Sequence, residues 1–171
     1  MEKAFRRGPC LDRSRSSRYT GGSHPKSPMP DSNFELDPRL AADTRFVGDL
    51  ALSRVLLIND SNYPWLLLVP RRRGVSEITD LGHLERAHLM TEITAVADAL
   101  KAETNCDKLN IAALGNVVPQ LHVHIIARSH NDAAWPRPVW GHAPAQPYTD
   151  KAAGEIVARL HKRIWFTSER R

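Results

Sequence analysis

The sequence predicts an α+β fold, in which a long helix and a C-terminal helix pack on an antiparallel β-sheet. Two observations carry this prediction. Short apolar stretches bounded by turn-forming residues occur in two pairs, and each pair is followed by a segment whose apolar residues have helical spacing. A chain of 171 residues, 42% of them hydrophobic, is long enough to bury one sizeable core. The order strand–strand–helix–strand–strand–helix therefore predicts a single α+β domain.

Four strands are expected, over residues 54–59, 65–69, 108–114 and 121–128. Asp60-Ser-Asn-Tyr-Pro64 between the first two is turn chemistry, so this pair is predicted to be a hairpin. Gly115-Asn116 lies between the last two strands, and Pro119 closes that bend.

Three helices are expected, over residues 37–42, from Asp80 to about Glu103, and from near Asp150 onward. The side chain of Asp37 can cap the first of them. The long helix has one apolar stripe at helical spacing, formed by Leu89, Ile93, Val96 and Leu100. The last helix has an equivalent stripe, formed by Ile156, Leu160 and Ile164.

The net charge of +5 comes from the first 28 residues, which hold seven Lys/Arg and two Asp/Glu, while 17 Lys/Arg and 17 Asp/Glu cancel in the rest. Residues 1–32 are expected to be a disordered basic tail, and residues 33–171 a folded domain. The tail is interpreted as a nucleic-acid-binding arm, a transit peptide, or an extension upstream of a true start at Met29, which is preferred. Nucleic acid is therefore not expected as a partner, except weakly through the tail.

Composition also limits where the protein works. No apolar run approaches the roughly 20 residues needed to span a bilayer, so no membrane role is expected. The N-terminus lacks the hydrophobic core of a secretory signal. Two cysteines, Cys10 and Cys106, form neither a disulfide framework nor a zinc cluster. A cytoplasmic location is the simplest expectation.

Residues 110–128 carry the strongest chemical signal. Alternate side chains of a strand share a face, so Gln120, His122 and His124 are expected on one face, with the apolar residues between them in the core. One interpretation is an ordinary half-exposed strand. A second is a metal site, because His-x-His can supply two ligands, although the other six histidines lack ligand-like spacing. The third is nucleophilic catalysis, because a neutral imidazole can attack phosphorus while its neighbours hold the phosphate oxygens.

Gln120-Leu-His-Val-His-Ile-Ile126 resembles the histidine triad motif, His-φ-His-φ-His-φ-φ, of the HIT superfamily of nucleotide hydrolases and transferases, with Gln120 in place of the first His. The resemblance covers about residues 34–145 and includes Asn110 followed by Gly115, and Leu-Val-Pro70 before the long helix. With Ala-Trp-Pro-x-Pro-Val-Trp-Gly after the motif, the string is similar to a bacterial subgroup called diadenosine-tetraphosphate-hydrolase-like. A HIT-like fold is implied.

The resemblance implies catalytic roles residue by residue. His122 matches the nucleophile, which attacks the α-phosphorus of a nucleotide and forms a nucleotidyl-histidine that water hydrolyses. His124 matches the last triad His, which bonds a phosphate oxygen. Gln120 donates and accepts hydrogen bonds but does not change charge near pH 7, so a proton relay through it is not expected. Trp65 stands where many HIT hydrolases have another His, and its indole either walls the site or belongs to the core.

Binding residues are implied in the same way. Asn110 would donate to the phosphate or leaving-group side, and backbone N–H groups around Asn116 and Val117 would add donors. Asn59 or Asp60 stands at the ribose position, with Asn59 preferred. Three further features have two readings each: Arg71-Arg72-Arg73 is a solvated loop or steers polyphosphates, Arg128 approaches phosphate or pairs with Asp132, and Trp135 and Trp140 cover the sheet or reach a second subunit.

The implied substrate is a purine nucleotide, such as a dinucleoside polyphosphate, phosphoramidate or ester, hydrolysed by a homodimer without a cofactor. Two alternatives stay open: a catalytically weak nucleotide-binding HIT protein, and a His-x-His metal-binding protein.

Overall fold

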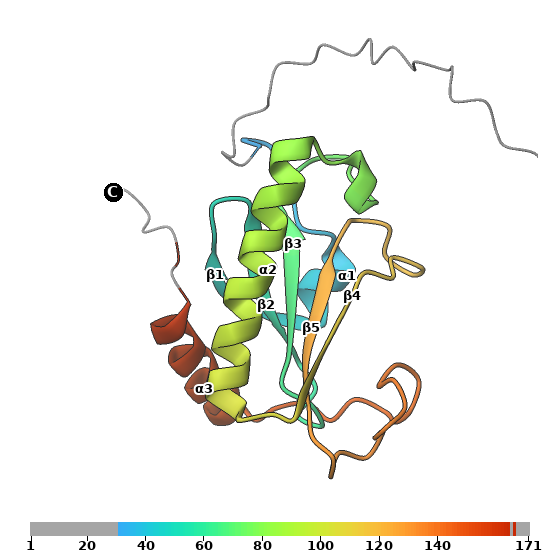
Figure 1. Ribbon diagram of the computed structural model, residues 1–171, viewed down its shortest axis with the longest axis vertical. Coiled ribbons are helices and arrows are strands. Elements are labelled where there is room, and N and C mark those ends of the chain that lie inside the picture. The colour runs from blue at the N-terminus through green and yellow to red at the C-terminus, as the bar shows by residue number, and fades with distance from the viewer. Residues whose placement is uncertain (1–30, 165, 167–171) are drawn as a thin grey trace, which may run out of the picture.

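A five-stranded antiparallel sheet, with the strand order β1-β2-β3-β5-β4, forms the centre of the molecule (Figure 1). The computed structural model describes residues 31–164 and 166. Its strands are β1 Thr44–Asp49, β2 Ser53–Ile58, β3 Trp65–Pro70, β4 Lys108–Ala112 and β5 Val123–Arg128. Its helices are α1 Pro38–Ala42, a 3-10 turn η1 Ile78–Asp80, α2 His83–Thr104 and α3 Asp150–Arg163. The predicted α+β class is confirmed. Residues 1–30 of the predicted tail, Met29 included, lie outside the described residues, whereas Asp31 donates its N–H to the carbonyl of Arg71 and so belongs to the fold.

β1 is the strand that the sequence did not reveal, so the predicted order of elements is wrong by one strand. It lies at the sheet edge, and its pairing with β2 is irregular between Phe46 and Gly48. A Cβ at Gly48 would clash with the ring of Phe166, so this position has no room for a side chain. This segment contains polar residues, a glycine and a bulge, so its β-strand propensity is too weak to predict a strand. The segment becomes a strand because it pairs with β2.

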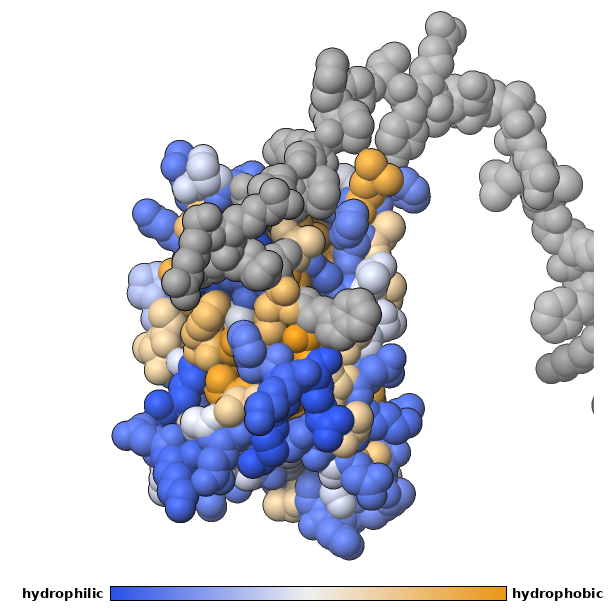
Figure 2. Space-filling model, turned by 90° about the vertical axis from the view of Figure 1, so that its left-hand side faces the viewer, coloured by the Kyte–Doolittle hydropathy of each residue, from blue (hydrophilic) through white to orange (hydrophobic). Residues whose placement is uncertain are grey.

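The side of the molecule that bears β1 has hydrophobic residues on its surface. Figure 2 shows hydrophobic residues gathered in its middle and hydrophilic residues most densely placed toward the end where α3 lies. Phe46 of β1 is 57% exposed, and the guanidinium of Arg54 lies 5.3 Å from the centroid of its ring. The guanidinium thus makes a cation–π contact with the exposed ring on this edge strand.

The first hydrophobic core lies between the sheet and the two long helices. The predicted stripes are buried: Leu89, Ile93, Val96 and Leu100 from α2, and Ile156, Leu160 and Ile164 from α3 and its end. Alternate residues of the motif strand meet them from the sheet, namely Leu121, Val123 and Ile125. Burying each such side chain contributes about 1.5–3 kcal/mol. Among the described residues, no helix is both long and apolar enough to cross a membrane.

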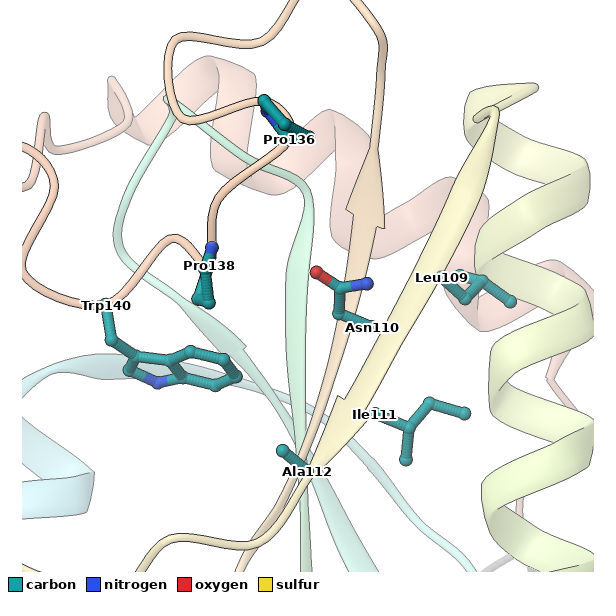
Figure 3. A pocket seen from close by; sticks show the side chains of 7 residues that line it. All are labelled: Leu109, Asn110, Ile111, Ala112, Pro136, Pro138 and Trp140. Atoms are coloured by element: carbon teal, nitrogen blue, oxygen red, sulfur yellow. The ribbon is translucent and has the colours of Figure 1, made fainter. Parts of the chain in front are cut away.

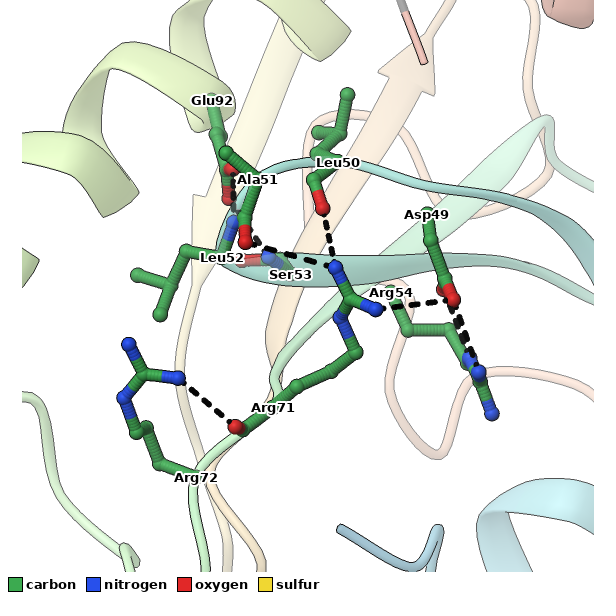
Figure 4. Close-up of polar contacts among 9 residues, drawn as sticks. All are labelled: Asp49, Leu50, Ala51, Leu52, Ser53, Arg54, Arg71, Arg72 and Glu92. Atoms are coloured by element: carbon green, nitrogen blue, oxygen red, sulfur yellow. Dashed lines mark hydrogen bonds and ion pairs between the residues drawn. The ribbon is translucent and has the colours of Figure 1, made fainter. Parts of the chain in front are cut away.

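Polar anchors fasten the β1–β2 turn and the end of β3 to the rest of the fold (Figure 4). The buried Glu92 of α2 accepts hydrogen bonds from the N–H groups of Leu52 (2.7 Å) and Ser53 (3.0 Å). Arg71 bonds Asp49 and the carbonyl of Leu50. Arg72, 3% exposed, pairs with Glu85, which also caps α2. Two of the three arginines at 71–73 are therefore structural, which contradicts the solvated-loop interpretation for them, while electrostatic steering stays a prediction.

A second core lies on the opposite face, under α1 and residues 134–140. Its members include Tyr63, Trp65, Leu67, Val69, Ile126 and Val139, with Leu40 from α1. Asp37 caps α1 as predicted, since its side chain accepts the N–H of Arg39. Because residues alternate along β5, this second face also receives the histidines of the motif.

Candidate functional site

Two imidazoles lie side by side on the sheet face that carries the second core. His124 belongs to β5, between Leu67 of β3 and Ala112 of β4. His122 precedes β5 by one residue, and the centroids of the two rings are 4.9 Å apart. Each histidine is buried but keeps 7% of its surface exposed, so neither is sealed inside the core. The predicted alternation of side chains along the motif is confirmed.

The tautomer of His122 follows from its hydrogen bond. Its Nδ1 lies 2.7 Å from the backbone carbonyl oxygen of Gln120. A carbonyl oxygen only accepts, so Nδ1 must carry the proton and donate it. In the neutral ring, Nε2 then has a free lone pair, which is the state that a nucleophile or a base requires.

His124 has the opposite tautomer. The indole Nε1–H of Trp65 donates to its Nδ1 over 3.0 Å, so the proton of the neutral ring must be on Nε2. Burial, and secondarily the proximity of His122, lowers the pKa of His124 to about 4. At neutral pH the ring is therefore an uncharged hydrogen-bond donor through Nε2.

Two tryptophans wall this histidine. The ring of Trp65 lies 5.4 Å from that of His124 between centroids, and the ring of Trp140 lies edge-on at the same distance. Trp65 thus belongs to the site and not only to the core. Trp140 covers the sheet of its own chain, which is the first of its two predicted readings.

The side chain of Gln120 faces the segment before α1. Its Oε1 accepts the N–H of Asp37 and its Nε2 donates to the carbonyl of Glu35, both over 2.9 Å. The amide therefore fastens residues 35–37, and both of its ends are already used. Only the backbone carbonyl of Gln120 touches a catalytic candidate, through His122.

Asp37 and Arg39, which the sequence did not mark as site residues, lie at the same end of the sheet. Hydrogen bonds from Arg39 chiefly lower the pKa of Asp37, and His122 adds a smaller electrostatic effect. Arg39 also donates to the carbonyl of Val117 over 2.8 Å. In the sequence these two residues look like a helix cap and a surface arginine, and only folding brings them beside residues 117–122.

The carboxamide of Asn110 is oriented by a buried arginine. Its Oδ1 accepts a 2.7 Å hydrogen bond from Arg128, so its NH2 group is left as the donor that the prediction requires. Arg128 is 2% exposed and makes two bonds to Asp132, at 2.7 and 3.0 Å, and one to the carbonyl of Arg137. Of the two predicted readings, Arg128 takes the pairing with Asp132.

A pocket of about 470 Å³ opens between the β4 edge and the proline-rich segment. Its lining is Leu109, Asn110, Ile111, Ala112, Pro136, Pro138 and Trp140. Figure 3 shows the carboxamide of Asn110 on the side of β4 that faces Trp140 and Pro138, with Leu109 and Ile111 on the other side. Because Ala112 pairs with His124, the pocket lies next to the second imidazole. Its volume is in the range of small-molecule sites.

Asn59 and Asp60 lie away from the histidines. Asn59 is five residues beyond the level of His122 along β2, about 17 Å at the rise of a strand. Its Oδ1 accepts the N–H of Tyr148. Asp60 is 6% exposed, and its Oδ1 accepts the N–H groups of Gln146 and Asn62. These oxygens fasten the segment that leads into α3.

The loop before the motif is open to solvent. Asn116 is exposed and Val117 is 78% exposed. Within the described part of the chain, the N–H groups of these two residues make no hydrogen bond, so they are available to a ligand. The bond from Arg39 to the Val117 carbonyl holds this loop against α1.

The described residues contain no group of three or more His, Cys, Asp and Glu side chains that could hold a metal ion. One nitrogen of His124 is already occupied by Trp65. The metal interpretation therefore gains no third ligand at this site.

Comparison with known proteins finds a matching family and similar solved structures. A family model described as "HIT domain" matches residues 39–131. A histidine triad protein from Bradyrhizobium japonicum is 57% identical, with a TM-score of 0.76 over 77% of this chain and 98% of that one. Histidine triad proteins from Sinorhizobium meliloti (43% identity, TM-score 0.76, 77% and 98% covered) and Marinobacter aquaeolei (44%, 0.75, 77% and 96%) are also similar. No curated protein matches the sequence.

Proposed function

The chain belongs to the HIT domain family, and on that premise we propose that it is a nucleotide hydrolase in which His122 accepts the nucleotidyl group. Proteins of this family are generally nucleotide hydrolases or transferases. The observation that carries the proposal is the hydrogen bond from His122 Nδ1 to the Gln120 carbonyl, because it leaves the Nε2 lone pair free.

The proposed reaction has two displacements. Nε2 of His122 attacks the α-phosphorus, an N–P bond forms, and the bond to the leaving group breaks with its electron pair going to that group. Water then attacks the same phosphorus, the N–P bond breaks, and the nucleoside monophosphate is released while the proton of the water passes to solvent. Both steps build charge on phosphoryl oxygens, which the Nε2–H of His124 and the NH2 group of Asn110 can stabilise.

The proposed substrates are purine nucleotides with a substituted α-phosphate, such as dinucleoside polyphosphates, phosphoramidates or esters, as in the diadenosine-tetraphosphate-hydrolase-like subgroup. The backbone N–H groups of Asn116 and Val117 would bind phosphate. For the ribose, Asn59 and Asp60 stay candidates through Nδ2 and Oδ2, which make no bond to the described residues. Because Asn59 lies about 17 Å along the strands from the level of His122, this contact requires the nucleotide to extend along β2 away from the nucleophile. Phe34, Leu36 and Ile58 are each partly buried against the second core, and we propose that such apolar side chains contact the base.

Trapping with a labelled nucleotide tests the proposal. Rapid acid-free quenching during turnover, followed by mass spectrometry, should show a nucleotidyl adduct on the peptide that contains His122. His122→Asn should lower turnover by on the order of a thousandfold or more, because the nucleophile is lost, while AMP binding by calorimetry persists. Full turnover by this variant, or an adduct on another residue, would overturn the mechanism.

A nucleotide-binding protein with little catalysis is the second candidate. The two bonds that occupy the Gln120 amide favour it, because no group at that position can relay a proton. AMP binding without hydrolysis of diadenosine polyphosphates, adenosine phosphoramidate or aminoacyl adenylates would support this candidate against the first.

A homodimer is part of the proposal. β4 is an edge strand, and Ile111 on it is 47% exposed, while Leu84 and Met90 of α2 are 55% and 58% exposed. An edge strand that pairs on one side only within the described residues, and that carries an exposed apolar side chain, suits a second copy. Light scattering should give twice the chain mass, and Ile111→Glu should give the monomer. A cytoplasmic location also stays a proposal, based on the two cysteines alone.

A further inference from the structure

We infer that Trp65 is a positioning residue, whose indole N–H fixes the neutral tautomer of His124 and so makes Nε2–H a permanent hydrogen-bond donor toward the substrate. The inference rests on the proposed function only for the identity of the acceptor, a phosphoryl oxygen. The tautomer itself depends on the Trp65–His124 contact.

The contact is well defined. The two nitrogens are 3.0 Å apart in a buried bond between neighbouring strands, with Trp65 opposite Ile126 and Leu67 opposite His124. An indole N–H only donates, so the alternative tautomer of His124 would set two N–H groups against each other. Because both side chains are at least 91% buried, such a repulsive pair of donors is strongly disfavoured.

The surroundings of His124 keep it neutral as well as oriented. The titratable group that acts on it is His122, and the side chains packed around it from β3, β4 and the proline-rich segment are uncharged: Trp65, Leu67, Ala112 and Trp140. Protonation of Nδ1 would break the bond from Trp65. Trp65 thus acts as a fixed donor to Nδ1, and His124 gives the substrate a hydrogen bond without handing over a proton.

The neutral tautomers of His122 and His124 are consequently complementary. A backbone carbonyl holds the proton of His122 on Nδ1, and an indole holds the proton of His124 on Nε2. One ring therefore presents a lone pair and its neighbour presents a donor, with ring centroids 4.9 Å apart. This is the pair needed to attack a phosphorus and to stabilise the oxygens on it.

Nuclear magnetic resonance on the full chain with 15N-labelled histidine and tryptophan tests the inference without turnover. At pH 7, His124 should carry its proton on Nε2, and a 15N–15N coupling should be detected across the bond from Trp65 Nε1 to His124 Nδ1. A proton on Nδ1 of His124 in the wild-type protein would overturn the inference.

Two matched variants extend the test. Trp65→Phe keeps an aromatic ring but removes the donor, so the tautomers of His124 should mix and its titration midpoint, about 4 in the wild type, should rise by roughly one pH unit. Trp140→Phe removes the same atoms from the other wall, whose Nε1 bonds to none of the described residues, and should leave the tautomer unchanged. An unchanged tautomer in Trp65→Phe would contradict the inference, and the wild-type spectrum decides it if that variant does not fold.

The two proposals fail separately. The expected tautomer without a nucleotidyl adduct on His122 would reject the proposed function alone. An adduct on His122 together with a proton on Nδ1 of His124 would reject the role of Trp65 alone.

Discussion

At the scale of single residues, protonation at the site is set by what each imidazole nitrogen contacts. The carbonyl of Gln120 and the indole of Trp65 impose opposite tautomers on two histidines that are two positions apart. The sequence predicts that both rings share a face, because strand side chains alternate, but it cannot predict a tautomer. The tautomer of His124 depends on Trp65, which is 59 residues away in the chain.

The low pKa of His124 predicts a pH-dependent stability. Its folded pKa of about 4 lies below the ordinary value of 6.5, so between these values the unfolded chain binds more protons and the free energy of unfolding falls as pH falls. Between pH 7 and 4.5 the loss from this group should be about 2 to 3 kcal/mol.

Urea unfolding at the two pH values measures this loss. His124→Gln should have a flatter pH dependence by that amount, because its side chain does not titrate. Parallel pH dependences in the wild type and the variant would show that His124 does not carry the effect.

At the scale of elements, the Gln120 amide joins the motif to the chain before α1. Two hydrogen bonds of 2.9 Å hold residues 35–37, and Arg39 holds the loop at Val117. The helix cap at Asp37 is predictable from local sequence, but its partner at Gln120 is 83 residues away. Gln120, which stands in place of a triad histidine, thus holds the chain segment before α1 in position.

Gln120→Ala should release this segment selectively. The amide N–H of Asp37 loses its acceptor, so its hydrogen exchange should accelerate by on the order of tenfold, which corresponds to one net hydrogen bond. The amide of Tyr148, which Asn59 holds at the other end of the sheet, is the internal control. Equal acceleration at both amides would indicate general destabilisation and contradict the local role of Gln120.

At the scale of the whole molecule, buried polar anchors attach the segments that cover the sheet. Arg128 and Asp132 fix the start of the proline-rich segment, and Asn59 and Asp60 fix its end before α3. The pocket beside β4 exists because the segment between these anchors stands over the sheet edge (Figure 3). These anchors thus position the proline-rich wall of the pocket, although the anchor residues themselves do not contact the imidazoles.

Asp132→Ala should therefore be strongly destabilising. It leaves the guanidinium of Arg128, 2% exposed, without its counter-ion, and breaking a buried pair in this way costs about 3–5 kcal/mol. Asp150→Ala is the control, because its partner is the half-exposed Arg45 and such surface pairs contribute about 0–1 kcal/mol. Equal losses in urea unfolding would contradict a structural role for the buried pair.

The sequence by itself determined the elements whose pattern is local: the hairpin of β2 and β3, the buried stripes of α2 and α3, and the alternation that puts His122 and His124 on one face. Tertiary structure alone decided the edge strand β1, the partners of Gln120 and Asn59, and the bond from Trp65 to His124. The reason is physical. Periodicity and capping act over a few neighbouring residues, whereas a donor meets an acceptor 59 to 89 residues away only after the strands have paired.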